Sequence, residues 1–340
     1  MSDPTVPSVS PSSAASVPSG PTPVPFVRVR DLRVLSDATG VPLVDGVSFD
    51  VARGGAVGIV GESGSGKSLT LRAVMGLPPE GVRVADPAAV AFPATSDASD
   101  AADPSNPSDA SAPRLAMIFQ DPVASLDPLC GVVRQVAEVM RAHGTTDMSA
   151  LLGDGTSDAA ASVSVPTSGR RPFPFAGLRA RREAYRAAAD LLVALGLPAS
   201  LRDRDRYPGQ LSGGQCQRVG IAIALACRPD VLLCDEPTTA LDVTVQRQIL
   251  DLLASLRERL GLTMLFVTHN LGVAAHLCDR LVVMRRGRVV ETGPTARILA
   301  EPHDDYTKRL IDAILPIPGA SDAGRTDGEN ADDDGKEETR

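Results

Sequence analysis

The sequence lacks the features of a membrane-spanning or disulfide-bonded chain. Its five cysteines are an odd number and include no CxxC pair, which argues against a disulfide framework or a zinc knuckle. The longest run of apolar residues and glycine, Val219 to Cys227, has nine members, far short of the roughly 18 that would cross a bilayer. Residues 1–25 have neither a basic start nor an apolar stretch, so they do not resemble a secretory signal. We therefore expect a cytoplasmic chain that does not cross a membrane by itself.

An excess of positive charge is also absent. The 340 residues include 34 lysines and arginines against 42 aspartates and glutamates, for a formal net charge of −8. Most of this charge belongs to residues 319–340, which contain eight acidic and three basic side chains. The remaining chain is close to neutral, so there is no general case for a nucleic-acid partner.

Three segments have few large apolar side chains: residues 1–25, 93–113 and 319–340. Such segments cannot bury enough apolar surface to offset the entropy lost on ordering. We therefore expect a disordered N-terminal segment (1–25), a folded domain (26–318) with a low-complexity insertion at 93–113, and an acidic disordered tail (319–340). Residues 144–169, rich in Gly, Ser, Thr and Ala, predict a second irregular connection.

Short apolar runs alternate with longer amphipathic ones, which is typical of an α/β fold. The pattern predicts strands at residues 26–34, 46–51, 56–60, 115–119, 231–234, 263–267 and 281–284. It predicts helices at residues 66–76, 132–141, 180–195, 213–226 and 243–260. Runs such as VLLC and MLFV suit central parallel strands that are buried on both faces. A helical subdomain is predicted between the strand at 115–119 and the helix at 213–226, over residues 120–212.

The strongest local motif is a glycine-rich loop, GESGSGKS, that follows an apolar strand and opens a helix. It matches G-x-x-x-x-G-K-[ST], in which backbone N–H groups converge on phosphate oxygens and the helix N-terminus adds its positive dipole. Lys67 would reach the β- and γ-phosphates, and Ser68 would ligate Mg²⁺. The members of this predicted phosphate loop are Gly61, Glu62, Ser63, Gly64, Ser65, Gly66, Lys67 and Ser68.

A second apolar strand ends in two carboxylates, Asp235 and Glu236. Asp235 suits the coordination shell of Mg²⁺, and Glu236 could polarise a water for attack on the γ-phosphate. Strands often end in acidic residues, so this pattern alone is weak evidence for a nucleotide site. Together with the phosphate loop it becomes strong evidence.

A further glycine-rich helix start, LSGGQ, begins at Leu211. The Ser212 hydroxyl and the N–H groups of Gly213 and Gly214 form a second phosphate-binding surface of the same physical kind. Two half-sites in one chain predict that two such chains pack head to tail, with each nucleotide between Lys67 of one and Ser212 of the other. Ser212 would also cap its own helix, because capping and ligand binding use the same N–H groups.

Together these motifs resemble those of the ATP-binding subunits of ABC transporters, over about residues 27–315. The resemblance implies a P-loop NTPase with a mainly parallel core sheet, an antiparallel β subdomain and an inserted α-helical subdomain. It implies ATP and Mg²⁺ as the cofactors. LSGGQ matches the family's signature, which implies nucleotide contacts from Ser212, Gly213, Gly214 and Gln215.

Three shorter motifs complete the resemblance. Phe119-Gln120 resembles the Q-loop, in which Gln120 would touch Mg²⁺ and the attacking water. Ala240-Leu241-Asp242 resembles the D-loop, which implies that Asp242 lies near the nucleotide of the opposite subunit. Thr268-His269 is similar to the switch histidine, which implies that His269 contacts the γ-phosphate during catalysis by Glu236.

The finer resemblance is to importers of dipeptides, oligopeptides and nickel. It rests on MIFQDP with SLDP, on DEPTTALDVTVQ, and on Tyr306-Thr307. It implies an ATPase on the cytoplasmic face of the cell membrane that drives peptide uptake from a head-to-tail dimer. The implied partners are transmembrane permease subunits, a second ATP-binding subunit (the same or a related chain) and, indirectly, an extracytoplasmic solute-binding protein.

Two alternatives stay open on the sequence. Nickel or another small solute is one, because the chain after Pro316 lacks the cysteine-containing segment that is common in the peptide branch. A non-transport ABC ATPase of DNA maintenance is the other, although such proteins carry long coiled coils and no sustained heptads occur here. Where the family usually stacks an aromatic residue on adenine, this sequence has Ser36, so we expect little preference for ATP over GTP.

Overall fold

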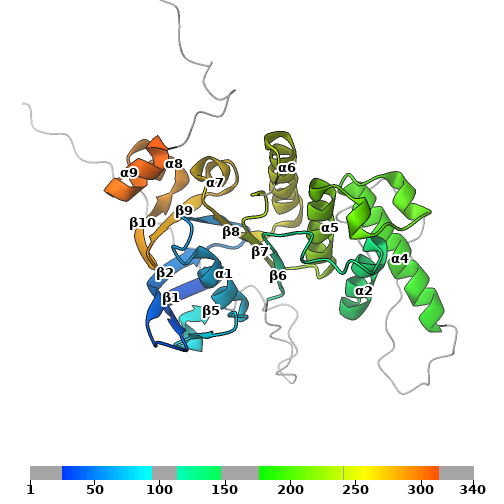
Figure 1. Cartoon of the computed structure of the whole chain (residues 1–340), viewed down its shortest axis with the longest axis horizontal. Coiled ribbons are helices and arrows are strands. Elements are labelled where there is room, and N and C mark those ends of the chain that lie inside the picture. The colour runs from blue at the N-terminus through cyan, green and yellow to red at the C-terminus, as the bar shows by residue number, and fades with distance from the viewer. Residues whose placement is uncertain (1–24, 94–112, 147–175, 240, 314–340) are drawn as a thin grey trace, which may run out of the picture.

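The computed structural model describes residues 25–93, 113–146, 176–239 and 241–313 (Figure 1). The segments expected to be disordered or irregular, 1–25, 93–113, 144–169 and 319–340, lie almost wholly outside these residues, so those expectations stay predictions. Ala240 of the predicted D-loop also lies outside them. No helix within the described ranges is long and apolar enough to cross a membrane.

A six-stranded sheet forms the centre of the molecule, in the order β10-β9-β3-β8-β7-β6. Its strands are β3 (Ala56–Val60), β6 (Leu115–Ile118), β7 (Val231–Asp235), β8 (Thr263–Thr268), β9 (Arg280–Arg285) and β10 (Arg288–Pro294). All pairs from β9 to β6 are parallel, and β10 joins β9 at the edge in antiparallel register. The predicted mainly parallel core sheet is therefore confirmed.

Helices cover both faces of this sheet, which is why its central strands are apolar throughout. Every residue of β3, β7 and β8 is buried. Val57 and Ile59 of β3 belong to the core shared with helix α1 (Lys67–Met75). Ala56 and Val60, on the opposite face, belong to the core beneath helices α6 (Val243–Leu260) and α7 (Leu271–Leu277).

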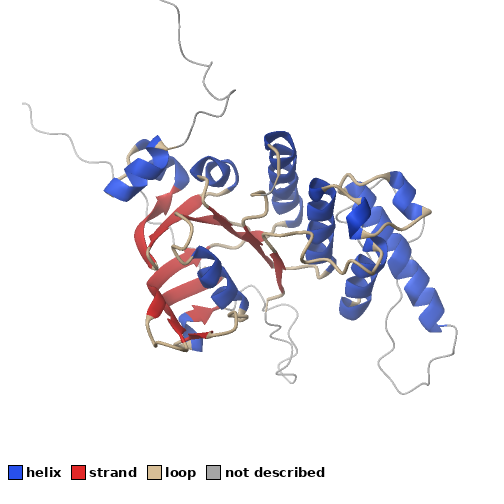
Figure 2. Cartoon of the chain, in the orientation of Figure 1, coloured by secondary structure: helices blue, strands red, loops and turns tan. Residues whose placement is uncertain are grey.

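A smaller antiparallel sheet packs against the same face as α1 (Figure 2). In it, β1 (Val27–Ser36) pairs with β2 (Pro42–Val51), β4 (Val82–Val84) and β5 (Val90–Ala91), all in antiparallel register. This sheet confirms the predicted antiparallel subdomain. Its strands β4 and β5 are too short to show an alternation of apolar and polar residues, so the sequence pattern does not predict them.

The helical portion lies on the far side of the core sheet from this antiparallel sheet (Figure 1). It contains α2 (Val132–His143) and α4 (Ala176–Ala194), which pack on each other and on α5 (Gly213–Ala226). The buried residues of α2 recur at helical spacing: Val132, Val133, Val136, Ala137 and Met140. The Asp205 carboxylate accepts hydrogen bonds from the N–H groups of Val133 and Arg134 and so caps this helix.

The described chain ends in two short helices, α8 (Thr295–Ala300) and α9 (Asp305–Asp312), which follow β10. The apolar pattern did not predict them, nor α7 or β10, because the three helices have at most eight residues each, too few to establish a helical period, and β10 includes a Gly-Pro pair. By contrast, α5 and α6 have the predicted bounds. Helix α1 is one residue shorter at each end than predicted, because Gly66 and Gly76 adopt left-handed backbone conformations that delimit it.

Candidate active site

The phosphate loop connects β3 to α1 and curls tightly against the end of β9. Gly61 opens the loop with φ of 153°, and a Cβ atom built there would lie 2.1 Å from the carbonyl oxygen of Met284. Only glycine fits such a backbone approach. Gly66, at φ 96°, turns the chain into α1. The loop residues thus take the strand-loop-helix arrangement that the motif predicts.

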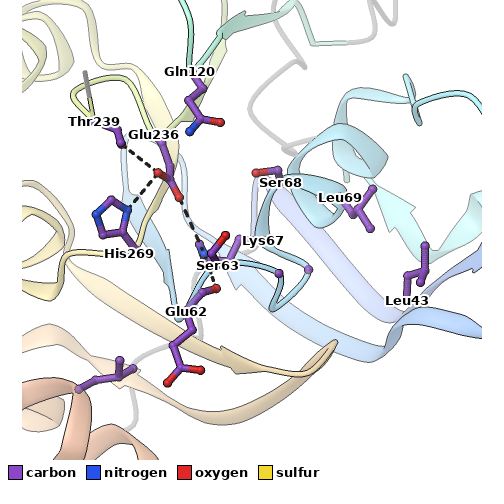
Figure 3. Close-up of a pocket in the computed structure, with 13 residues that line it drawn as sticks. Leu43, Glu62, Ser63, Lys67, Ser68, Leu69, Gln120, Glu236, Thr239 and His269 are labelled. Carbon is purple, nitrogen blue, oxygen red and sulfur yellow. Dashed lines mark hydrogen bonds and ion pairs between the residues drawn. The ribbon is translucent and has the colours of Figure 1, made fainter. Parts of the chain in front are cut away.

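A cavity of about 710 Å³ opens over this loop. The loop contributes Glu62, Ser63, Gly64, Gly66, Lys67 and Ser68, and α1 adds Leu69. Distant parts of the chain complete the wall with Leu43, Gln120, Glu236, Thr239, His269 and Leu310 (Figure 3). The other two loop residues, Gly61 and Ser65, do not line the cavity. The predicted residues of three motifs, Gln120, Glu236 and His269, therefore meet over the phosphate loop.

Lys67 is 4% exposed and folds back over its own loop. Its ammonium donates hydrogen bonds to the carbonyl oxygens of Gly61 at 2.9 Å and Glu62 at 2.8 Å. Burial lowers the pKa of Lys67, and the carboxylates of Glu236 and Asp235 oppose that shift. The ammonium is thus a desolvated cation facing the cavity, ready to exchange carbonyl oxygens for more strongly attracting phosphate oxygens.

Ser68 and Asp235 lie together at the other side of the loop. The Ser68 hydroxyl donates to Asp235 Oδ1 at 2.7 Å, and Asp235 is 2% exposed. Burial raises the pKa of Asp235, and the hydrogen bond from Ser68 opposes the rise. A hydroxyl and a carboxylate are hard oxygen donors, and one or two of them beside substrate phosphates is how proteins hold Mg²⁺. The pair therefore fits the predicted Mg²⁺ ligands.

Glu236 is held in place through both its backbone and its side chain. Its backbone is left-handed, with φ of 45°, and its N–H donates to the Val267 carbonyl. Its Oε2 accepts a hydrogen bond from the Thr239 hydroxyl at 2.9 Å and lies 3.0 Å from His269 Nδ1. Its Oε1 lies 3.9 Å from Lys67 Nζ. Because an ionised carboxylate only accepts, His269 Nδ1 carries the hydrogen of this contact, and Oε1 is the oxygen left facing the cavity.

Thr239 lines the cavity, although the sequence motifs do not predict it as a site residue. It stands three residues after Glu236 and locks the carboxylate orientation together with His269, as Figure 3 shows. The stretch DEPTT contains it, but no periodicity or charge marks a threonine in a turn. Leu43, Leu69 and Leu310 were missed for a similar reason, because a lone leucine in the sequence does not show that it borders a cavity.

The signature residues stand apart from the cavity. Among the described residues that line it, none is Ser212, Gly213, Gly214 or Gln215. Ser212 Oγ accepts from the Gln215 N–H at 3.3 Å, and Gln215 Oε1 accepts from the Ser212 N–H at 3.1 Å, so the pair forms a capping box on α5. A Cβ built on Gly214 would lie 2.6 Å from Val245 Cγ1, so this glycine allows α5 to approach α6.

Asp242 likewise caps a helix within this chain. Its Oδ1 accepts from the Val245 N–H at 2.9 Å, at the start of α6. The described structure thus explains both motifs as helix caps, and their predicted nucleotide contacts stay predictions. Ser36 also lies outside the cavity lining, where Leu43 of β2 forms the wall instead. That Ser36 faces the base stays a prediction, and Leu43 is an apolar side chain on the wall of the cavity.

A strand-loop-helix phosphate site, an acidic strand end and a histidine that holds the second carboxylate define a P-loop ATPase. The ABC transporter family model matches residues 44–239 of the chain. A putative peptide import ATP-binding protein of Brucella melitensis is 36% identical over 309 residues, which cover 88% of this chain and 81% of that protein. The oligopeptide transport ATP-binding protein AmiE of Streptococcus pneumoniae is 36% identical over 302 residues, with coverages of 88% and 74%.

Solved structures agree with this likeness. The cbiO1 protein of Clostridium perfringens, part of the ABC transporter complex cbiONQ, aligns with a TM-score of 0.54 at 25% identity and covers 82% of this chain and 91% of that one. The ATP-binding cassette MJ0796, in a dimeric post-hydrolysis state with ADP and Pi, aligns with a TM-score of 0.50 at 25% identity, with coverages of 79% and 98%. The chain belongs to the ATP-binding proteins of the ABC transporter family and is an ATPase of that family.

Proposed function

We propose that the chain is the ATP-hydrolysing subunit of a peptide importer and acts on the cytoplasmic face of a membrane permease formed by other chains. The observation that carries the substrate class is the likeness to peptide and oligopeptide transport subunits over most of the chain. Under this proposal an extracytoplasmic binding protein delivers the solute to the permease. The ATPase dimer drives the permease to open alternately to the two sides of the membrane.

The contacts in the cavity support a specific division of work. Lys67 offsets the charge of the β- and γ-phosphates. Glu236 takes a proton from the attacking water through Oε1, the oxygen that its partners Thr239 and His269 leave unengaged. Gln120, which lines the same cavity and lies near Glu236 in Figure 3, orients that water. Mg²⁺ held by Ser68 and Asp235 would supply charge neutralisation at the phosphates when bound.

The position of the signature supports a head-to-tail dimer. The N-terminus of α5 carries the N–H groups of Gly213 and Gly214 beside the Ser212 hydroxyl, yet lies outside the cavity of its own chain. A second copy packed head to tail would bring its Ser212, Gly213 and Gly214 over the phosphates, with Gln215 and Asp242 at the same interface. The partner in the dimer is the same chain or a related one, and all motifs here are intact, so two copies suffice for activity.

Nickel or another small solute is the alternative substrate that the sequence leaves open. Uptake assays in membrane vesicles that contain the ATPase with its co-encoded permease and binding protein separate the candidates. Peptide import predicts ATP-dependent accumulation of labelled oligopeptide that unlabelled peptide competes and Ni²⁺ does not. Accumulation of Ni²⁺ without peptide transport would overturn the peptide assignment and leave the ATPase assignment standing.

A further inference from the structure

The C-terminal helix α9 touches the phosphate loop through one side chain. The hydroxyl of Tyr306 accepts a hydrogen bond from the backbone N–H of Glu62, at 2.9 Å. Glu62 is the second residue of the loop that faces the phosphates. We propose that Tyr306 is a positioning residue, which holds the Gly61–Glu62 stretch in the conformation that binds ATP. The proposal rests on the assignment of the cavity as the ATP site.

Both polar groups of the Glu62 backbone are engaged, and the two contacts differ in what ATP does to them. The Glu62 carbonyl oxygen accepts from the Lys67 ammonium at 2.8 Å, whereas the N–H donates to Tyr306. When the Lys67 ammonium turns to the phosphates, the carbonyl contact weakens. The Tyr306 contact uses the Glu62 N–H and not Lys67, so it does not depend on where the ammonium turns. Tyr306 at the Glu62 N–H, and the Ser65 N–H that donates to the Glu62 carbonyl at 3.2 Å, therefore remain to hold this part of the loop while ATP is bound.

Strand β9 supports the same stretch from its end. The Met284 carbonyl packs against Gly61, where a Cβ would lie 2.1 Å from its oxygen. The neighbouring Arg285 guanidinium lies 4.9 Å from the centroid of the Tyr306 ring, a cation–π distance. Tyr306 is thus fixed by β9 at its ring and reaches the loop with its hydroxyl. Burial raises the pKa of Tyr306, so the hydroxyl stays neutral at physiological pH.

The start of α9 is itself held in place, which is what a positioning role requires. The Asp304 carboxylate accepts from the Tyr306 N–H at 2.8 Å and caps the helix. The buried Glu291 carboxylate accepts from the N–H groups of His303 at 3.1 Å and Asp304 at 3.2 Å. Burial alone would raise the pKa of Glu291, but these hydrogen bonds and Arg297 lower it, so the anchor is ionised. The backbone that carries Tyr306 therefore cannot shift freely.

A second residue of α9 shows that the helix borders the nucleotide site. Leu310, one turn after Tyr306 and on the same face, lines the cavity. Tyr306 is 4% exposed, so its ring would serve a merely structural role equally well as phenylalanine. Only the hydroxyl distinguishes a positioning role from a merely structural one, because it is the group that contacts the loop.

Tyr306→Phe tests the proposal because it removes the hydroxyl and keeps the ring. An unpaired Glu62 N–H lets the loop relax in the ATP-free protein, so we expect the Kd for ATP to rise about five- to twentyfold. The value of kcat at saturating ATP should stay within about threefold, because Glu236 and His269 are untouched. The melting temperature without ATP should change by less than about 2 °C. Tyr207→Phe, at a tyrosine that is 52% exposed, is the matched control and should leave all three values unchanged.

An unchanged Kd for ATP in Tyr306→Phe would overturn the proposal, whether or not the melting temperature falls. Lys67→Ala, measured alongside, separates this failure from a wrong site. If Lys67→Ala loses ATP binding and Tyr306→Phe does not weaken it, only the role of Tyr306 is wrong. If Lys67→Ala binds ATP as tightly as the native chain, the assignment of the cavity as the ATP site fails and the Tyr306 proposal fails with it.

Discussion

Replacing Glu236 by glutamine should separate ATP binding from ATP hydrolysis. Glutamine keeps the size of the side chain, and its carbonyl oxygen can still accept from Thr239 and His269, so the fold of the site should persist. It loses the charge at Oε1, the oxygen left to take a proton from water. A general base contributes about 10²- to 10⁴-fold to a rate, so we expect kcat to fall by that factor.

The same geometry sets the direction of the binding effect. Glu236 Oε1 lies 3.9 Å from Lys67 Nζ, and two unit charges at such a distance interact by about 4 kcal/mol at an effective dielectric constant of 20. The carboxylate thus competes with the phosphates for Lys67 and also repels them. Its neutralisation should leave the affinity for ATP unchanged or raise it, and the ATP-bound dimer should accumulate.

Steady-state ATPase assays, nucleotide titration and size-exclusion chromatography with ATP measure the three quantities. Glu138→Gln, which removes an exposed carboxylate on α2, is a matched control and should behave as the native protein. Turnover by Glu236→Gln near the native rate would remove Glu236 from the role of base. Loss of ATP binding would instead show that its charge holds the site together.

Other changes should have equally distinct outcomes. Lys67→Ala should lose ATP binding in a titration, because it deletes the buried cation that faces the phosphates; retained affinity would contradict this role. Burial lowers the pKa of Lys67 and bound phosphates would raise it, so the affinity for ATP should fall as the pH rises through the lowered pKa. An ATP affinity that does not change at alkaline pH would contradict the contact between Lys67 and the phosphates. Leu43→Ala should weaken the binding of ATP and of GTP alike by about fivefold, because it removes roughly 1 kcal/mol of apolar contact with the nucleotide. An unaffected affinity would show that the adenine or guanine ring does not contact Leu43. Deletion of residues 95–112 should leave ATPase activity and melting temperature nearly unchanged, since the segment has no large apolar side chain and loop closure costs only about 0.6 kcal/mol per doubling of length; a large loss of stability would show that it packs.

The chemistry of the site was largely predictable because each key residue belongs to a local pattern with its own physical reason. The phosphate loop needs Gly61 and Gly66 for its backbone, and Asp235 and Glu236 end a wholly buried strand. Parallel strands bring their carboxyl ends to one edge of a sheet, so β3, β7 and β8 deliver Lys67, Glu236 and His269 to the same place.

The rest was not predictable because it depends on contacts between elements far apart in the chain. Tyr306 reaches Glu62 across 244 residues, and no periodicity in the sequence records such a pairing. Leu43 and Leu310 border the cavity from β2 and α9, which only the packing of the two sheets and the last helix determines. Ser36 is not among the described residues that line the cavity, where the neighbouring strand β2 contributes Leu43.

The head-to-tail site is tested most directly by mixing two inactive variants. Lys67→Ala destroys the phosphate-loop half, and Ser212→Asp puts a negative charge in the signature half while keeping a good cap on α5. Each variant alone should have background ATPase activity, whereas the native chain alone is active. In a mixed dimer one site combines the intact Lys67 of one copy with the intact Ser212 of the other, so an equimolar mixture should regain roughly a quarter of native activity. A mixture that stays at background would contradict an ATP site shared between two copies of this chain.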